Sequence, residues 1–156
     1  LDPDAPFAAT FLRDMPRGGP AAFISQSGAI AEEVIAKSHT MRLPFGAVVS
    51  VGNAVHLGIT EYLEHYGRDE RCKAIALYVE SFGDVERFKA VAREVSRKKP
   101  VIALVGGRTL PGTGAVLRHT GADALGNDAL DRMFAACGVI RAGSLRRLLV
   151  ACKGLG

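Results

Sequence analysis

Short apolar runs alternate along this chain with stretches in which apolar residues recur every three to four positions. The runs are rich in valine, isoleucine and alanine and are bounded by glycine, proline or serine, which is typical of buried strands. The recurring spacing is typical of helices that bury one face. Strands are predicted at residues 21–25, 47–51, 74–79, 101–105 and 139–140. Helices are predicted at residues 28–38, around 59–66, from 85, from 127 or 128, and from 145.

Local residue signals place several helix ends. Asp84 and Ser144 each precede a helical pattern and are predicted N-caps, because their side chains can accept a hydrogen bond from the first helical turn. Gly138 follows the fourth helical pattern and suits a C-terminal cap.

The alternation of strands and helices predicts an α/β fold. We expect a three-layer, doubly wound parallel sheet of about five strands in the flavodoxin-like arrangement. Right-handed crossovers would place the carboxyl ends of the strands at one edge of the sheet. Residues 1–19, rich in proline and glycine, are predicted to be a linker or arm, and residues 20–156 the domain itself. Since the chain opens without methionine, we expect it to be excised from a larger protein.

Composition narrows the class of protein. With 48% hydrophobic and 23% charged residues, the 156-residue chain suits one ordered globular domain. Its apolar runs are too short to span a bilayer and it shows no signal peptide, so no membrane association is expected. The net charge of +4 is spread along the chain without interleaved aromatic residues, which argues against nucleic-acid binding. The basic run at residues 97–99 is expected to be solvated surface.

The cysteines indicate a reducing compartment. Cys72, Cys137 and Cys152 have no metal-like spacing and form an odd number. We expect free thiols, and therefore a cytoplasmic protein.

A long glycine-rich segment, residues 106–125, follows the fourth predicted strand and contains His119. Loops of this length without regular structure are uncommon and are usually functional or disordered. A histidine there is a candidate nucleophile, but a surface loop with an incidental histidine explains the pattern equally well.

The turn Ser25-Gln26-Ser27-Gly28 joins the first predicted strand to its helix. Small residues and a helix N-terminus together suit a phosphate or carboxylate, although plain N-capping by Ser27 is the commoner reason for a serine here. The turn lacks the lysine and glycine pattern of a P-loop, and no strand is followed by a dinucleotide-binding glycine motif.

Two further candidates follow the other predicted strands. Glu80 ends a buried strand, where a carboxylate needs a partner; a histidine and a lysine or arginine are both plausible. Gly52 and Asn53 follow the second strand and suit either close backbone approach to a ligand or a simple turn.

All four candidates fall at the carboxyl edge of the predicted sheet, where open α/β sheets bind ligands. A histidine, a carboxylate that orients it and a helix N-terminus that holds an anion are the parts of a phosphohistidine site. The residues alone therefore favour His119 as a carrier of a phosphoryl group, with Glu80 as its partner.

Seven short motifs occur in a fixed order along nearly the whole chain. They are AFISQSGA at 22–29, VSVGN at 49–53, ALYVES at 76–81, KPV at 99–101, GRT at 107–109, HTGA at 119–122 and CGVI at 137–140. In these motifs the chain resembles the succinyl-CoA-ligase-like domain of the NDP-forming acyl-CoA synthetases, the superfamily of succinyl-CoA synthetase and ADP-forming acetate–CoA ligase.

The resemblance implies specific roles. His119 takes the place of the phosphorylated histidine and Glu80 that of the glutamate that steadies it, so these two are the expected catalytic residues. The expected phosphate-binding residues are Ser25, Gln26, Ser27, Gly28, Gly52, Asn53, Thr120 and Gly121.

The resemblance also implies a reaction in which a small carboxylic acid, CoA and ATP (or GTP) give acyl-CoA, NDP and phosphate. Coenzyme A, the nucleotide and Mg²⁺ would be bound mainly by a CoA-binding domain, which residues 1–19 would follow, and by an ATP-grasp domain or subunit. The isolated chain would then be inactive in the full reaction. The alternative is a non-catalytic, ligand-sensing module of an acyl-CoA-synthetase-like protein acetyltransferase; the presence of both His119 and Glu80 favours catalysis.

The chain departs from many relatives at two places. Residues 54–58 read AVHLG where those relatives have an acidic segment, and Arg118 stands where serine often precedes the histidine. Both departures bear on the substrate and the activity rather than on the fold.

Overall fold

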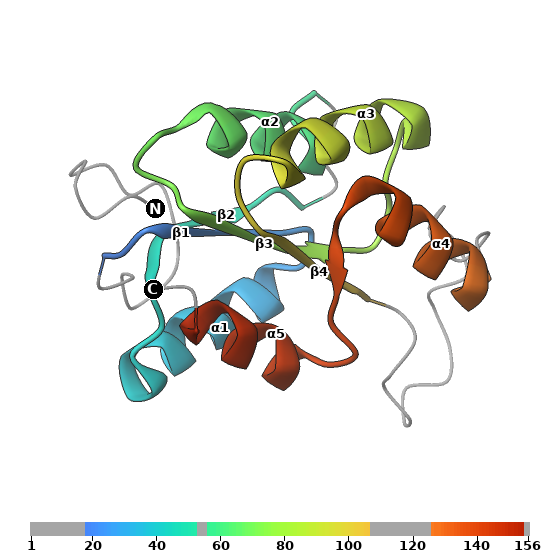
Figure 1. Ribbon diagram of the computed structural model, residues 1–156. Coiled ribbons are helices and arrows are strands. Elements are labelled where there is room, and N and C mark those ends of the chain that lie inside the picture. Colours follow the sequence, from blue (N-terminus) through green and yellow to red (C-terminus); the bar gives the residue numbers. More distant parts are fainter. Residues whose placement is uncertain (1–17, 53–55, 107–125, 155–156) are drawn as a thin grey trace.

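The computed structural model describes residues 18–52, 56–106 and 126–154. Within them five strands alternate with five helices (Figure 1). In chain order these are β1 (Ala21–Ser25), α1 (Gly28–Met41), β2 (Phe45–Ser50), α2 (Ile59–Arg68), β3 (Ala74–Val79), α3 (Val85–Ser96), β4 (Val101–Val105), α4 (Asn127–Cys137), β5 (Ile140–Arg141) and α5 (Leu145–Lys153).

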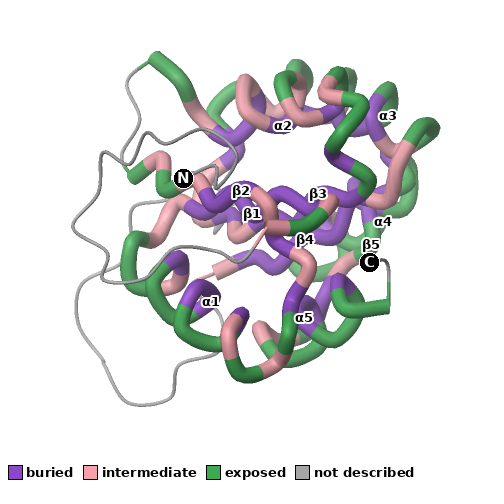
Figure 2. Tube along the Cα trace, turned by 90° about the vertical axis from the view of Figure 1, so that its left-hand side faces the viewer, coloured by how far each residue is buried: buried purple, intermediate pink, exposed green. Residues whose placement is uncertain are grey.

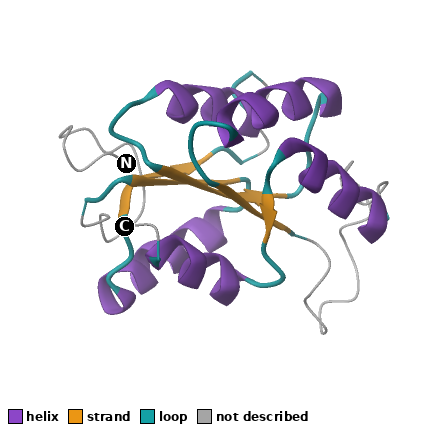
Figure 3. Cartoon of the chain, viewed as in Figure 1, coloured by secondary structure: helices purple, strands orange, loops and turns teal. Residues whose placement is uncertain are grey.

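The strands form one parallel sheet in the order β2-β1-β3-β4-β5. Helices α2, α3 and α4 cover one face and α1 and α5 cover the other (Figure 3). Both faces of the sheet are therefore buried, and Figure 2 shows the buried residues concentrated along the strands and the inner sides of the helices. This strand order is that of the flavodoxin-like doubly wound fold, so the predicted fold class is confirmed.

The helix caps follow the local signals. The side chains of Asp84 and Ser144 accept hydrogen bonds from the backbone N–H groups of Arg87 and Arg147, as N-caps do. Gly138 ends α4 in the left-handed conformation, with φ of 70°, which glycine adopts without strain. These predictions are confirmed.

Three boundaries differ from the predicted ones because tertiary contacts set them. β2 starts two residues early, at Phe45, since this fully buried residue pairs with Ala21. α1 continues past Ser38 to Met41, because the buried Ser38 hydroxyl donates to the Ile35 carbonyl and needs no break in the helix. The last strand, predicted at 139–140, lies one residue later because the Val139 N–H donates a hydrogen bond to the Phe134 carbonyl at the end of α4.

Lys99 is not the solvated residue that the basic run predicted. Its two predecessors are exposed, but its own amine donates to the carbonyls of Tyr66, Asp69 and Cys72 at 3.0, 2.9 and 2.8 Å. These carbonyls lie at the end of α2 and in the turn after it, where a helix leaves acceptors unpaired. The expectation was therefore wrong for Lys99, which ties this turn together.

Candidate functional site

The carboxyl ends of β1, β2, β3 and β4 meet at one edge of the sheet. Ser25 pairs in register with Ser50 of β2 and with Tyr78 of β3, and Val79 pairs with Val105 of β4. The Val51 N–H donates to the Ser25 carbonyl at 2.8 Å, which extends this contact beyond the end of β2. The turns that carry the predicted site residues are therefore neighbours in space.

The turn between β1 and α1 satisfies most of its own polar groups. Ser25 is fully buried; its hydroxyl donates to the Ser27 carbonyl at 2.8 Å and accepts from the Ser27 N–H at 3.1 Å. The Ser27 hydroxyl accepts from the Ile30 N–H at 3.4 Å and so caps α1. The two serines therefore shape the turn through their side chains.

Two backbone N–H groups at the start of α1 remain uncommitted. Those of Gly28 and Ala29 have no hydrogen-bond acceptor within the described part of the chain, and both residues are exposed. A β-carbon on Gly28 would lie 3.8 Å from Oγ of Ser50, which places that hydroxyl beside the helix end. Open N–H groups at the positive end of a 14-residue helix are suited to an anion. Ala29 was not among the predicted residues; its only signal is its place as second residue of the helix.

The side chain of Gln26 points to β3 instead of to solvent. Its Oε1 accepts from the backbone N–H groups of Glu80 and Ser81 at 2.5 and 2.8 Å, and its Nε2 donates to the Ser81 carbonyl at 2.8 Å. The Gln26 N–H donates to the Tyr78 carbonyl at 3.1 Å. Gln26 thus joins the first turn of the site to the segment that contains Glu80.

Glu80 is half-buried, and its carboxylate has no ion pair or hydrogen bond within the residues that the structure describes. The alternative interpretation, a salt bridge to lysine or arginine, therefore has no support in these residues. Burial raises the pKa of Tyr78, and the negative charge of Glu80 raises it further.

Tyr78 is a residue of this edge that the sequence reasoning missed. A β-carbon on Gly106 would lie 2.4 Å from the Tyr78 hydroxyl, so a larger residue there would require the tyrosine ring to move. Tyr78 therefore packs against Gly106, just past the end of β4. A tyrosine inside an apolar run gives no signal of this position.

Several predicted site residues lie outside the described residues: Asn53, His119, Thr120 and Gly121. Gly52 is described; it is exposed with φ of 53°, in the left-handed region. The structure thus brings the β1–α1 turn, Gly52 and Glu80 to one edge, while the contacts of His119 stay a prediction.

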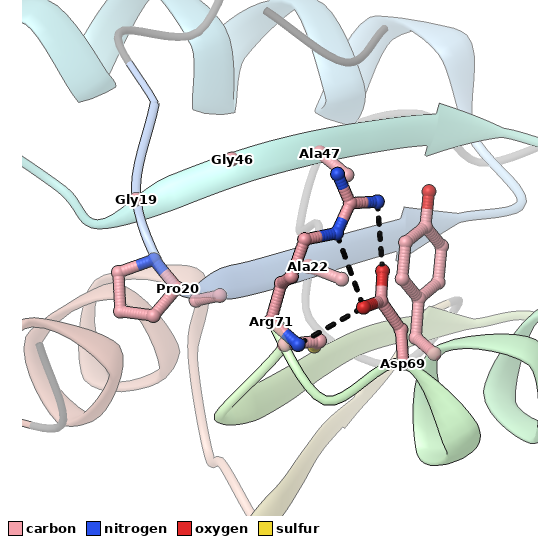
Figure 4. Close-up of a pocket in the computed structure, with 10 residues that line it drawn as sticks. Gly19, Pro20, Ala22, Gly46, Ala47, Asp69 and Arg71 are labelled. Carbon is pink, nitrogen blue, oxygen red and sulfur yellow. Dashed lines mark hydrogen bonds and ion pairs between the residues drawn. The ribbon is translucent and has the colours of Figure 1, made fainter. Parts of the chain in front are cut away.

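The opposite, amino edge of the sheet holds a small cavity of about 40 Å³ (Figure 4). Arg71 forms a two-pronged ion pair with Asp69 there, at 3.2 and 3.1 Å, and this hydrogen bonding lowers the pKa of the Asp69 carboxyl. Gly46 is required at this edge, since its β-carbon would lie 2.1 Å from the Gly19 carbonyl oxygen. The cavity is far below the roughly 300–1,000 Å³ of ligand pockets, so it is a packing feature.

Two further properties concern only the described residues. No group of three or more histidine, cysteine, aspartate or glutamate side chains among them is placed to hold a metal ion. None of the described helices is long and apolar enough to cross a membrane.

Comparison with known proteins gives a consistent picture. The family model described as "Succinyl-CoA ligase like flavodoxin domain" matches residues 18–155. The chain is 37% identical over 140 residues to acetate–CoA ligase [ADP-forming] I of Archaeoglobus fulgidus, covering 90% of this chain and 20% of that protein. It is 40% identical over 124 residues to the alpha subunit of acetate–CoA ligase [ADP-forming] I of Pyrococcus furiosus, covering 80% and 27%.

Solved structures agree. PH0766 from Pyrococcus horikoshii OT3 matches with a TM-score of 0.72 and 31% identity, covering 88% of this chain and 27% of that one. A dinucleotide-forming acetyl-coenzyme A synthetase 1 of Ca. Korarchaeum cryptofilum, solved with phosphate and ADP, matches with a TM-score of 0.72 and 28% identity, covering 88% and 30%. The chain thus spans less than a third of the length of these relatives.

Proposed function

This chain belongs to the family of succinyl-CoA ligase-like flavodoxin domains, and we propose that it is the phosphohistidine-bearing domain of an NDP-forming acyl-CoA synthetase. The reaction joins a small carboxylic acid to CoA at the expense of ATP or GTP and releases NDP and phosphate. Since relatives are much longer than this chain, we propose that a CoA-binding domain and an ATP-grasp domain or subunit bind CoA, the nucleotide and Mg²⁺. The same proposal places the protein in the cytoplasm.

One observation carries the proposal. At the carboxyl edge, the Glu80 carboxylate and the N–H groups of Gly28 and Ala29 at the start of α1 have no partner among the described residues. The hydroxyls of Ser25 and Ser27 and the Oε1 of Gln26 are already hydrogen-bonded. Among the described residues, the Glu80 carboxylate remains available as an acceptor and the two N–H groups of α1 as donors, which suits a cationic ring and a phosphate respectively.

The chemistry assigns a role to each group. A neutral ring nitrogen of His119 attacks phosphorus, the bond from phosphorus to the leaving oxygen breaks, and the leaving group keeps the electron pair. The ring becomes positive, and Glu80 stabilises it by accepting a hydrogen bond from the second ring N–H. The N–H groups of Gly28 and Ala29, aligned with the α1 dipole, bind the phosphate oxygens. In a second transfer, a carboxylate oxygen of the acid attacks the phosphorus, and the bond between phosphorus and the His119 nitrogen breaks, which gives an acyl phosphate and neutral His119. The CoA thiolate then attacks the acyl carbon and phosphate leaves.

Phosphorylation of the full-length protein tests this function. After incubation with Mg²⁺ and γ-labelled ATP, we expect an acid-labile, base-stable phosphate on His119, absent from His119→Ala. Addition of CoA with a panel of short carboxylic acids should discharge it for the acid that is the substrate. If ATP binds and the wild-type protein takes up no label, the phosphohistidine assignment fails and the ligand-sensing module becomes the better explanation.

A further inference from the structure

Gln26 makes three side-chain hydrogen bonds to a segment more than 50 positions away in the sequence. Its Oε1 accepts from the N–H groups of Glu80 and Ser81, and its Nε2 donates to the Ser81 carbonyl, all between 2.5 and 2.8 Å. We call this arrangement the Gln26 clamp. It holds the backbone that follows β3, where the described residues provide no further strand pairing.

The clamp uses most of what a glutamine side chain offers. A glutamine has one carbonyl oxygen and two N–H donors. The oxygen of Gln26 already accepts two bonds and its nitrogen already donates one. Within the described residues one donor remains, so the side chain is committed mainly to the backbone and not to a bound phosphate.

The clamp acts on the residue next to the chemistry. The Glu80 N–H is one bond from the α-carbon that carries the carboxylate, so a fixed N–H fixes the direction in which that side chain leaves the backbone. The Gln26 backbone N–H also binds the Tyr78 carbonyl at 3.1 Å, two residues earlier. Gln26 therefore holds the chain on both sides of Val79, while the carboxylate of Glu80 itself has no partner within the described residues.

We infer that Gln26 is a positioning residue for Glu80: its clamp holds the Glu80 backbone so that the carboxylate meets the phosphorylated histidine. This role rests on the proposed function, in which Glu80 supports that histidine. Without the clamp, the half-buried N–H groups of Glu80 and Ser81 lose their acceptor, the segment relaxes and the carboxylate is displaced. A displacement of about 1 Å in such a group can cost about 100-fold in rate.

A double-mutant cycle in the full-length protein separates this role from others. Gln26→Met keeps the length of the side chain and removes its hydrogen bonds. We expect it to slow histidine phosphorylation by about 10- to 100-fold with little change in KM for ATP. In a Glu80→Gln background, Gln26→Met should have no more than about a twofold further effect, because Gln26 acts through Glu80. An equal loss in both backgrounds would overturn the inference, since Gln26 would then act on the phosphate or on the whole fold.

Hydrogen exchange measures the clamp without reference to activity. In Gln26→Met, the backbone amides of Glu80 and Ser81 should exchange about 10-fold faster, as expected for loss of about one hydrogen bond of protection. Asp84→Ala is the matched control: it removes the N-cap bond to the Arg87 N–H at 3.0 Å, just beyond the clamp, and should leave the two amides and the phosphorylation rate unchanged.

The two measurements fail independently. Unchanged exchange at Glu80 and Ser81 in Gln26→Met overturns the clamp even if the wild-type protein is phosphorylated. Faster exchange in a protein that never takes up phosphate leaves the clamp in place, refutes the proposed function and removes the catalytic role of Gln26 with it.

Discussion

Gly67 lies in α2 at the point where that helix packs against α3. A β-carbon built on Gly67 would lie 2.4 Å from Cγ2 and 3.3 Å from Cγ1 of Val95. Val95 is only 5% exposed, and a β-branched residue in a helix has essentially one χ1 rotamer, so it cannot turn away. We therefore expect Gly67→Ala to push α2 and α3 apart and to destabilise the protein.

Two opposing effects set the magnitude. Overpacking a close contact costs about 1–3 kcal/mol. Replacing a helical glycine by alanine gains about 0.5–1 kcal/mol, because the unfolded chain loses conformational freedom. The net expectation is a loss of about 0–2.5 kcal/mol in the free energy of unfolding, centred near 1 kcal/mol. Once Val95 is replaced by alanine the clash is gone, and Gly67→Ala should stabilise by about 0.5–1 kcal/mol.

The sign change is what the assay must detect. Urea unfolding of the 156-residue chain, followed by far-UV circular dichroism, gives midpoints for the parent, Gly67→Ala, Val95→Ala and the double variant. Gly67→Ala is compared only within each background, so the cavity left by Val95→Ala cancels. A rise in midpoint with Val95 present, or the same fall with and without it, would refute the packing argument.

Two further predictions concern stability. Lys99→Met removes three hydrogen bonds to the end of α2 and the turn after it, so it should lower the free energy of unfolding in urea by about 1.5–3 kcal/mol. Lys98→Met is the control, because it breaks only an exposed ion pair with Glu94 and should leave the urea midpoint unchanged. Burial raises the pKa of the Cys152 thiol to about 12, whereas a cysteine in an unfolded chain has a pKa of about 8.5. The buried neutral thiol therefore contributes fully to stability below about pH 8.5, and this contribution declines as the pH rises from there toward 12. The urea midpoint should therefore fall less between pH 8 and pH 10.5 in Cys152→Ala than in the parent, and an equal fall would contradict the assignment.

The elements that the sequence predicts best have signals confined to a few neighbouring residues. β3 and β4 match the predicted ranges to the residue, because each is an apolar run buried on both faces of the sheet. Asp84 and Ser144 cap their helices through the next turn of the same chain. Where a distant partner sets the boundary, as Ala21 does for Phe45, the prediction misses by two residues.

The site follows the same division. Parallel strands bring their carboxyl ends together, so the shared edge of Ser25, Gly52 and Glu80 could be predicted from chain order alone. The partners of the polar groups could not. Gln26 forms hydrogen bonds to Glu80 and Ser81, which lie 54 and 55 positions later in the sequence. Lys99 forms hydrogen bonds to carbonyls 27 to 33 positions earlier. Contacts over such separations produce no periodic pattern of residues from which they could be predicted.

The way hydrogen bonds are distributed at this edge itself favours a ligand site. A fold that only needed to close the β1–α1 turn has done so with Ser25, Gln26 and Ser27, whose side chains all find protein partners. The Glu80 carboxylate and the first N–H groups of α1 stay open among the described residues although they share the edge. A single cation or anion would satisfy only one of these two sets. A phosphorylated imidazole presents a ring N–H to an acceptor and anionic oxygens to donors, so it satisfies both sets at once.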